Sequence, residues 1–117
     1  MQKETIVHIA CADWLRYFRN KTRRIFYFHC PNGGKRNKRE AELLKRMGVV
    51  PGVMDFWIFS AVSILPVEIK ADDTPFSKDQ IAAREHLETL GYKVYTIRTS
   101  DPVEGARLMQ ELVLANI

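Results

Sequence analysis

PGVMDFWIFSAVSILPVEIKADDTPFSKDQ, residues 51–80, is the stretch that decides the fold of this chain. It contains two apolar runs, 55–60 and 64–70, which are joined by a short Ala-Val-Ser link. Such runs favour β-strands, and the short link favours an antiparallel hairpin. After a polar loop, Ser77 is followed three residues later by Gln80, which is the capping-box arrangement at the start of a helix. The stretch therefore predicts a hairpin followed by a helix.

Charged residues stand at the ends of the two predicted strands. Alternate strand residues face the same way, so Glu68 and Lys70 project together while Ile69 faces the apolar side. Asp55 opens the first strand, and the hairpin brings it beside Glu68. Carboxylates at the edge of an apolar sheet are costly unless a cation compensates them. An E-x-K pair alone is commonly a surface ion pair, but the preceding Asp55 and the helix bearing Gln80 favour a site for metal-dependent phosphodiester hydrolysis.

The proposed ligands are oxygen atoms. Asp55, Glu68 and the backbone carbonyl of Ile69 would form a hard site suited to Mg²⁺ or Mn²⁺. Lys70 would orient or deprotonate an attacking water and stabilise the pentacovalent phosphorane. The sequence thus predicts both a metal site and a cationic group beside it.

The remaining sequence alternates helical and strand patterns. We expect further helices over 4–20 and 38–47 and from 102 onward, and further strands over 25–29 and 93–98. The predicted order is α-β-α-β-β-α-β-α, an α/β fold with a small mixed sheet and helices on both faces. With 117 residues and 46% apolar content, residues 1–117 are expected to form one domain with a real core.

Several protein classes are disfavoured by the sequence. No stretch is apolar for the ~18 residues that a membrane-spanning helix needs, and the N-terminus lacks a secretory signal pattern. Cys11 and Cys30 have no C-x-x-C spacing, so we expect reduced cysteines and a cytoplasmic protein, bacterial or of a phage in its host. His8, His29 and His86 lack H-x-H or H-E-x-x-H spacing, so packing or surface roles are expected for them.

Positive charge is concentrated in residues 16–46. This segment holds eleven of the eighteen Lys and Arg residues and two of the fourteen acids, so it carries +9 and the remainder −5. Such segregation is typical of a polyanion-binding protein, although a solvated basic face is the alternative. The loop after Cys30 can be a tight turn or a phosphate contact through bare amides and cations. The expected DNA-binding residues are Asn32, Gly33, Gly34, Lys35, Arg36, Lys38 and Arg39.

Five sequence blocks together resemble the VRR-NUC (virus-type replication-repair nuclease) family of the PD-(D/E)xK nuclease superfamily. They are PNGGKR (31–36), LLKRMGVVPGVMD (43–55), VEIKA (67–71), FSKDQ (76–80) and LGYKVYTIRT (90–99). The resemblance implies a restriction-endonuclease-like core. Met54 stands where the family often has proline.

The resemblance also implies residue roles. Asp55 and Glu68 would be the metal carboxylates and Lys70 the catalytic lysine. Gln80 would line the site, in addition to or instead of capping its helix. Glu4 would match the family's first-helix glutamate, which reaches the metal shell through water. The alternative is a first-turn carboxylate that the helix dipole stabilises.

The function implied is a Mg²⁺- or Mn²⁺-dependent, structure-specific DNA endonuclease resembling a Holliday-junction resolvase of DNA repair and recombination. Because a four-way junction has two-fold symmetry, a homodimer with two sites is expected, with DNA as the partner and no membrane. No base-reading motif is present, which favours recognition of DNA shape. Two alternatives remain: a nuclease acting on flaps, nicks or single strands, and a non-catalytic nucleic-acid-binding module.

Overall fold

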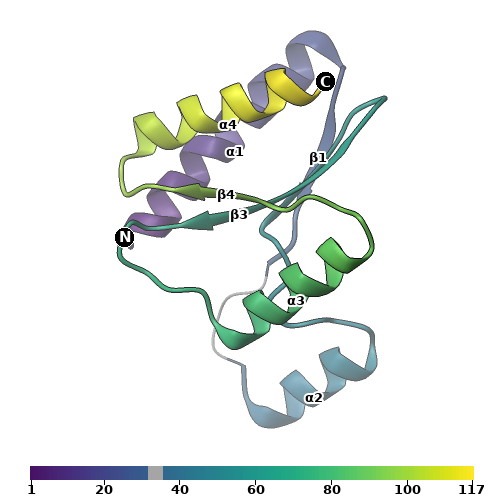
Figure 1. The fold of residues 1–117 in the computed structure, drawn as a ribbon. Coiled ribbons are helices and arrows are strands. Elements are labelled where there is room, and N and C mark those ends of the chain that lie inside the picture. Colours follow the sequence, from purple (N-terminus) through teal and green to yellow (C-terminus); the bar gives the residue numbers. More distant parts are fainter. Residues whose placement is uncertain (32–35) are drawn as a thin grey trace.

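A computed structural model of the chain describes residues 1–31 and 36–117 (Figure 1). The helices and strands follow the predicted order α-β-α-β-β-α-β-α. They are α1 (Lys3–Thr22), β1 (Phe26–His29), α2 (Lys38–Arg46), β2 (Phe56–Phe59), β3 (Ile64–Lys70), α3 (Lys78–Thr89), β4 (Tyr95–Arg98) and α4 (Pro102–Asn116). No helix within the described ranges combines the length and the apolar character needed to cross a bilayer.

The four strands form one mixed sheet in the order β1-β2-β3-β4. The pairs β1–β2 and β2–β3 are antiparallel, and β3–β4 is parallel. Phe56 of β2 lies opposite Val67 of β3, as the predicted hairpin requires. The helix α3 and its flanking loops form the crossover that the parallel pair needs. The mixed α/β sheet expected from the sequence is therefore confirmed.

The helices α1 and α4 cover one face of the sheet (Figure 1). Their buried side chains meet Val67 and Ile69 of β3 in one apolar core. The two helices approach closely at Gly105 of α4, where a Cβ atom would lie 2.6 Å from Val7 Cγ1. Cys11, also buried at this crossing, is a free thiol. Because Val67 and Ile69 pack in this core, strand alternation places Glu68 and Lys70 on the opposite face of the sheet.

The helix α3 lies on that opposite side (Figure 1). Its first turn has the predicted capping box, in which the Ser77 side chain accepts from the Gln80 backbone and the Gln80 side chain accepts from the Ser77 backbone. Gly52, just before β2, packs against this turn at a φ of 79°. A Cβ atom on Gly52 would overlap the backbone of Asp79 and Gln80. The glycine therefore permits the connector that precedes β2 to contact the start of α3.

Candidate metal-binding active site

The predicted oxygen ligands meet where β2 begins and β3 ends. Asp55 stands one position before β2, so the antiparallel register places it opposite Glu68. Asp55 Oδ2 accepts a hydrogen bond from the Ile69 backbone N–H at 2.7 Å. In a strand the N–H and C=O of one residue point toward the same neighbour, so the Ile69 carbonyl also faces the Asp55 side. The tertiary structure thus places the three predicted ligands at one end of the hairpin.

Glu68 is a buried acid with incomplete hydrogen bonding. Glu68 is 2% exposed, and among the described residues its Oε2 atom has no hydrogen-bond partner. Burial, followed by the hydrogen-bonding and charge interactions with Asp55, raises the pKa of Glu68 to about 9; Lys70 lowers it, and Glu4 raises it slightly. A buried charged oxygen without a partner is strongly unfavourable in an apolar interior. The site therefore favours either a proton or a cation at Glu68.

Lys70 lies on the same face of β3 as Glu68. It is 6% exposed, and within residues 1–31 and 36–117 no salt bridge involves it. Its Nζ atom lies 5.7 Å from the centroid of the Phe76 ring. The guanidinium groups of Arg84 and Arg98 lie 4.8 and 5.1 Å from the same ring. Phe76 thus gathers three cations next to the carboxylates, an arrangement that the sequence reasoning missed because the two arginines come from α3 and β4.

Gln80 contacts both the start of α3 and the Glu68 carboxylate. Its Oε1 atom accepts from the Ser77 N–H at 2.9 Å in the capping box. Its Nε2 atom donates to Glu68 Oε1 at 3.5 Å. The cap therefore orients the amide so that its other end reaches the buried carboxylate. Glu4, half-buried in the first turn of α1, is close enough to affect the pKa of Glu68, which is consistent with its predicted place near the metal.

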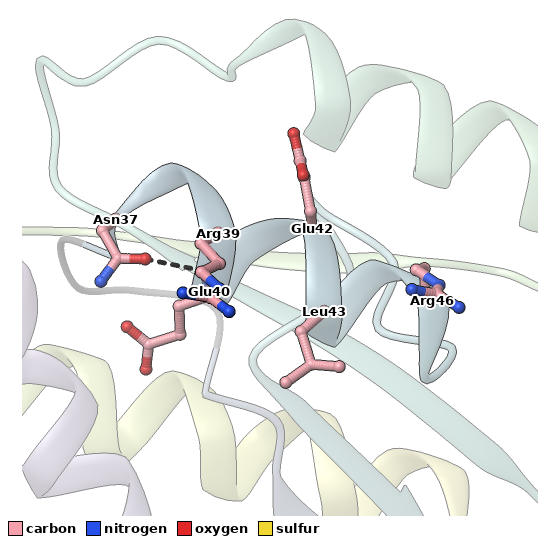
Figure 2. A pocket seen from close by; sticks show the side chains of 6 residues that line it. All are labelled: Asn37, Arg39, Glu40, Glu42, Leu43 and Arg46. Carbon is pink, nitrogen blue, oxygen red and sulfur yellow. Dashed lines mark hydrogen bonds between the residues drawn. The ribbon is translucent and has the colours of Figure 1, made fainter.

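The predicted DNA-binding residues Asn32, Gly33, Gly34 and Lys35 lie outside the described residues. Arg36, Lys38 and Arg39 are exposed, and α2 buries no side chain. A hollow of about 520 Å³ lies along α2, and Figure 2 shows the side chains that line it. Its lining mixes acids and bases: Asn37, Arg39, Glu40, Glu42, Leu43 and Arg46. This hollow lies on α2, away from the carboxylates, and offers no comparable set of buried charges.

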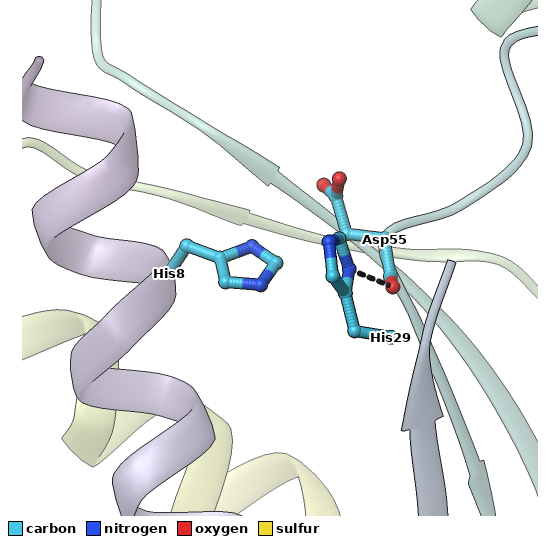
Figure 3. Close-up of side chains that lie close together, drawn as sticks. All are labelled: His8, His29 and Asp55. Carbon is cyan, nitrogen blue, oxygen red and sulfur yellow. Dashed lines mark hydrogen bonds between the residues drawn. The ribbon is translucent and has the colours of Figure 1, made fainter. Parts of the chain in front are cut away.

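Two histidines lie unexpectedly close to Asp55. His8 comes from α1 and His29 from the end of β1, and Figure 3 shows His8 extending toward His29 and Asp55. One ligand atom from each residue lies within 4.8 Å of the other two. The His8 ring also stacks on Phe56 at 4.4 Å, so the predicted packing role holds for it. Burial, followed by His29, lowers the pKa of His8, while Asp55 raises it. Sequence spacing could not reveal this cluster, because each residue comes from a different element.

Comparison with solved structures finds a similar chain described as "VRR_NUC domain protein". The alignment covers 99% of this chain and 92% of that one, with a TM-score of 0.65 and 21% sequence identity. This chain has the VRR_NUC fold. No family model matches the sequence, and neither does any curated protein. The VRR_NUC fold agrees with the expected restriction-endonuclease-like core.

Proposed function

We propose that this chain is a VRR-NUC nuclease, a divalent-metal-dependent endodeoxyribonuclease that cuts branched DNA. The observation that carries the proposal is the buried Glu68 carboxylate, whose Oε2 atom lacks a hydrogen-bond partner among the described residues. Asp55 and Lys70 flank it. Two acids and one lysine, turned away from the apolar core, fit phosphodiester hydrolysis better than they fit a structural ion pair. The VRR_NUC fold supports the same assignment.

The donor set fits Mg²⁺ or Mn²⁺. Asp55, Glu68 and the Ile69 carbonyl would hold the ion through oxygen atoms, which both metals accept. When bound, the ion supplies charge stabilisation at the phosphate and lowers the pKa of a water molecule. It would also compensate the buried charge of Glu68. The unpartnered oxygen is therefore the part of the site that a cation explains most directly.

The protein groups around the ligands have separate tasks. Gln80 holds Glu68 Oε1 through its amide. Lys70 lies on the same face as Glu68, where it would orient the attacking water and stabilise the negative charge of the phosphorane. Arg84 and Arg98, held over Phe76, would add positive charge on the same side. Glu4 would reach the metal shell through a water molecule.

DNA binding is assigned to the basic segment 16–46. Its net charge of +9 would attract phosphates, and the exposed cations of α2 would contact the DNA backbone. Neutralising the phosphates releases counterions, so binding should weaken steeply with salt. This mode reads the shape of DNA and not its base sequence, which suits a junction substrate.

A homodimer would supply the paired cuts that a four-way junction requires. An aromatic surface on β1 and β2 supports this proposal. Phe26 and Phe28 are 60% and 44% exposed, and both rings contact Phe59. Exposed apolar groups that lie together are typical of protein interfaces. Replacing Phe28 with Glu should convert a dimer to a monomer in sedimentation; a monomeric wild-type protein would contradict the dimer and leave the nuclease assignment intact.

The decisive experiment incubates the protein with a labelled four-way junction, a flap, linear duplex and single-stranded DNA, with Mg²⁺, Mn²⁺ or a chelator. We expect symmetric junction cuts that the chelator abolishes. Flap or single-strand cleavage without symmetric cuts would overturn the resolvase assignment alone. DNA binding without cleavage of any substrate, with either metal, would favour the non-catalytic module.

A second measurement tests the metal site without cleavage. Glu68→Gln removes the buried charge but keeps the shape of the side chain. In chelator it should raise the melting temperature by a few degrees, because folding no longer has to desolvate a carboxylate or take up a proton. The rise in melting temperature that Mn²⁺ gives the wild type should disappear in this variant. An unchanged Mn²⁺ effect would contradict the assignment of Glu68 as a ligand.

A further inference from the structure

Asp55 is close to side chains on both faces of the sheet. The proposed nuclease site uses only those on the face of Glu68. Glu68 lies on the sheet face away from α1 and α4. His29 pairs with Phe56 across β1 and β2, and therefore lies on the face that α1 covers. His8 reaches the same point from α1. The two imidazoles thus approach Asp55 from the side opposite Glu68, and none of the roles assigned so far uses their ring nitrogens.

We propose that His8, His29 and Asp55 form a second metal site, selective for a divalent transition metal such as Zn²⁺ or Co²⁺. The three side chains offer two imidazole nitrogens and one carboxylate oxygen, all within 4.8 Å of one another. Imidazole suits these metals and is a poor ligand for Mg²⁺. Three protein ligands leave one tetrahedral position for water or a phosphate oxygen.

The distances fit one ion after the ligand atoms move closer together. Ligand atoms about 2.1 Å from one tetrahedral ion lie about 3.4 Å apart. The upper limit of 4.8 Å among these atoms therefore requires closure of at most about 1.4 Å. The His29 side chain is exposed and can make this movement. His8 is held by its stack on Phe56 and supplies the fixed side of the site.

A hydrogen bond prepares His29 as a ligand. Its Nδ1 atom lies 2.8 Å from the Asp55 backbone carbonyl. A carbonyl oxygen can only accept, so Nδ1 must carry the proton in this contact. The neutral ring then leaves its Nε2 lone pair free to bind a metal. Metal-binding histidines generally donate their second ring nitrogen to a carbonyl or carboxylate in this way.

Asp55 would be shared between the two sites. Its Oδ2 atom accepts from the Ile69 N–H on the hairpin side, and a carboxylate can bridge two metal ions. Paired ions about 3.5–4 Å apart recur in phosphodiester-cleaving sites. The second site requires no cleavage activity in order to exist, so it can be tested by metal binding alone.

The test titrates chelator-treated full-length protein with Co²⁺, following its visible absorption bands, and then displaces Co²⁺ with Zn²⁺. His8→Phe keeps a ring on Phe56 but removes both nitrogens, and His29→Gln keeps an N–H donor for the Asp55 carbonyl. Each should weaken Co²⁺ binding at least about tenfold. The control His86→Ala removes an exposed histidine of α3 and should have no effect. Circular dichroism verifies that every variant is folded.

Glu68→Gln separates this inference from the proposed nuclease site. It should abolish DNA cleavage but retain one bound Co²⁺ with unchanged absorption. Loss of Co²⁺ in Glu68→Gln, together with normal binding in His8→Phe and His29→Gln, would overturn the histidine site and leave the carboxylate site standing. Absence of Co²⁺ and Zn²⁺ binding by the wild type would also overturn it.

Discussion

The end of the β2–β3 hairpin and the helix α2 differ in exposure to solvent. The hairpin carries the proposed catalytic residues, which are buried, and α2 carries proposed DNA-binding residues, which are exposed. Glu68 and Lys70 are 2% and 6% exposed and are fixed by a strand that packs in the core. The helix α2 buries no residue at all. Charges in the hairpin site act at short range, away from solvent, where position decides their effect. Charges on α2 act through a screened field, where their number matters more than their position.

The largest expected effect is a loss of cleavage without a loss of DNA binding. Lys70→Ala should lower the cleavage rate by roughly 10²–10³-fold, because a charge beside the phosphorane is lost. Junction affinity should stay near the wild-type value, since binding depends on the basic segment. Cleavage rates measure catalysis at the hairpin, and gel-shift affinities measure DNA binding. Lys93→Ala, at an exposed lysine before β4, is the control. Loss of binding in folded Lys70→Ala would make Lys70 a phosphate anchor.

The second prediction concerns the contact between the connector and α3. Gly52→Ala should lower the free energy of unfolding by roughly 1–3 kcal/mol, since its φ is positive and a Cβ atom overlaps the backbone of Gln80. The cleavage rate should fall too, because Gln80 shifts relative to Glu68. Urea unfolding and cleavage rates measure both effects.

Gly48→Ala is the matched control for Gly52→Ala. Gly48 also has a positive φ, 105°, but a Cβ atom there meets nothing within 4 Å. Gly48→Ala should lower the free energy of unfolding through backbone strain only, and it should leave the cleavage rate unchanged. Equal effects of the two variants on cleavage would show that the Gly52 contact does not position the site.

The third prediction tests the capping box. Ser77→Ala should cost about 1 kcal/mol of stability and reduce the cleavage rate modestly, because the first turn of α3 carries Gln80. Asp101→Ala removes the cap of α4, where the side chain accepts from Val103 N–H. It should cost similar stability without changing cleavage measured below the melting transition. A matching loss of cleavage in both variants would indicate general destabilisation.

The smallest expected effect belongs to single charges of α2. Lys38→Gln or Arg39→Gln should weaken DNA binding a few-fold on every substrate and reduce the salt slope of log K by about 1. The cleavage rate at saturating DNA should be unchanged. Arg107→Gln, at an exposed arginine of α4 that pairs with Glu111, is the control. An unchanged salt slope in the α2 variants would remove this helix from the DNA interface.

Local sequence patterns were sufficient to predict most of the architecture. Alternation in β3 indicated which side chains enter the core, and the Ser77–Gln80 spacing predicted the capping box. Both patterns depend on residues at most a few positions apart. Strand bounds were less accurate: the strands predicted over 55–60 and 93–98 are Phe56–Phe59 and Tyr95–Arg98. The ends of a strand depend on pairing with neighbours, which a local pattern does not contain.

The sequence by itself determined the hairpin, the common face of Glu68 and Lys70, and the approach of Asp55, because strand alternation and a short turn leave few other arrangements. Tertiary structure alone decided that Gly52 packs on the first turn of α3 and that His8 and His29 meet at Asp55. These contacts join elements that are distant along the chain. Their positions depend on how α1 and α3 pack against the sheet. No spacing of residues along the sequence encodes this packing.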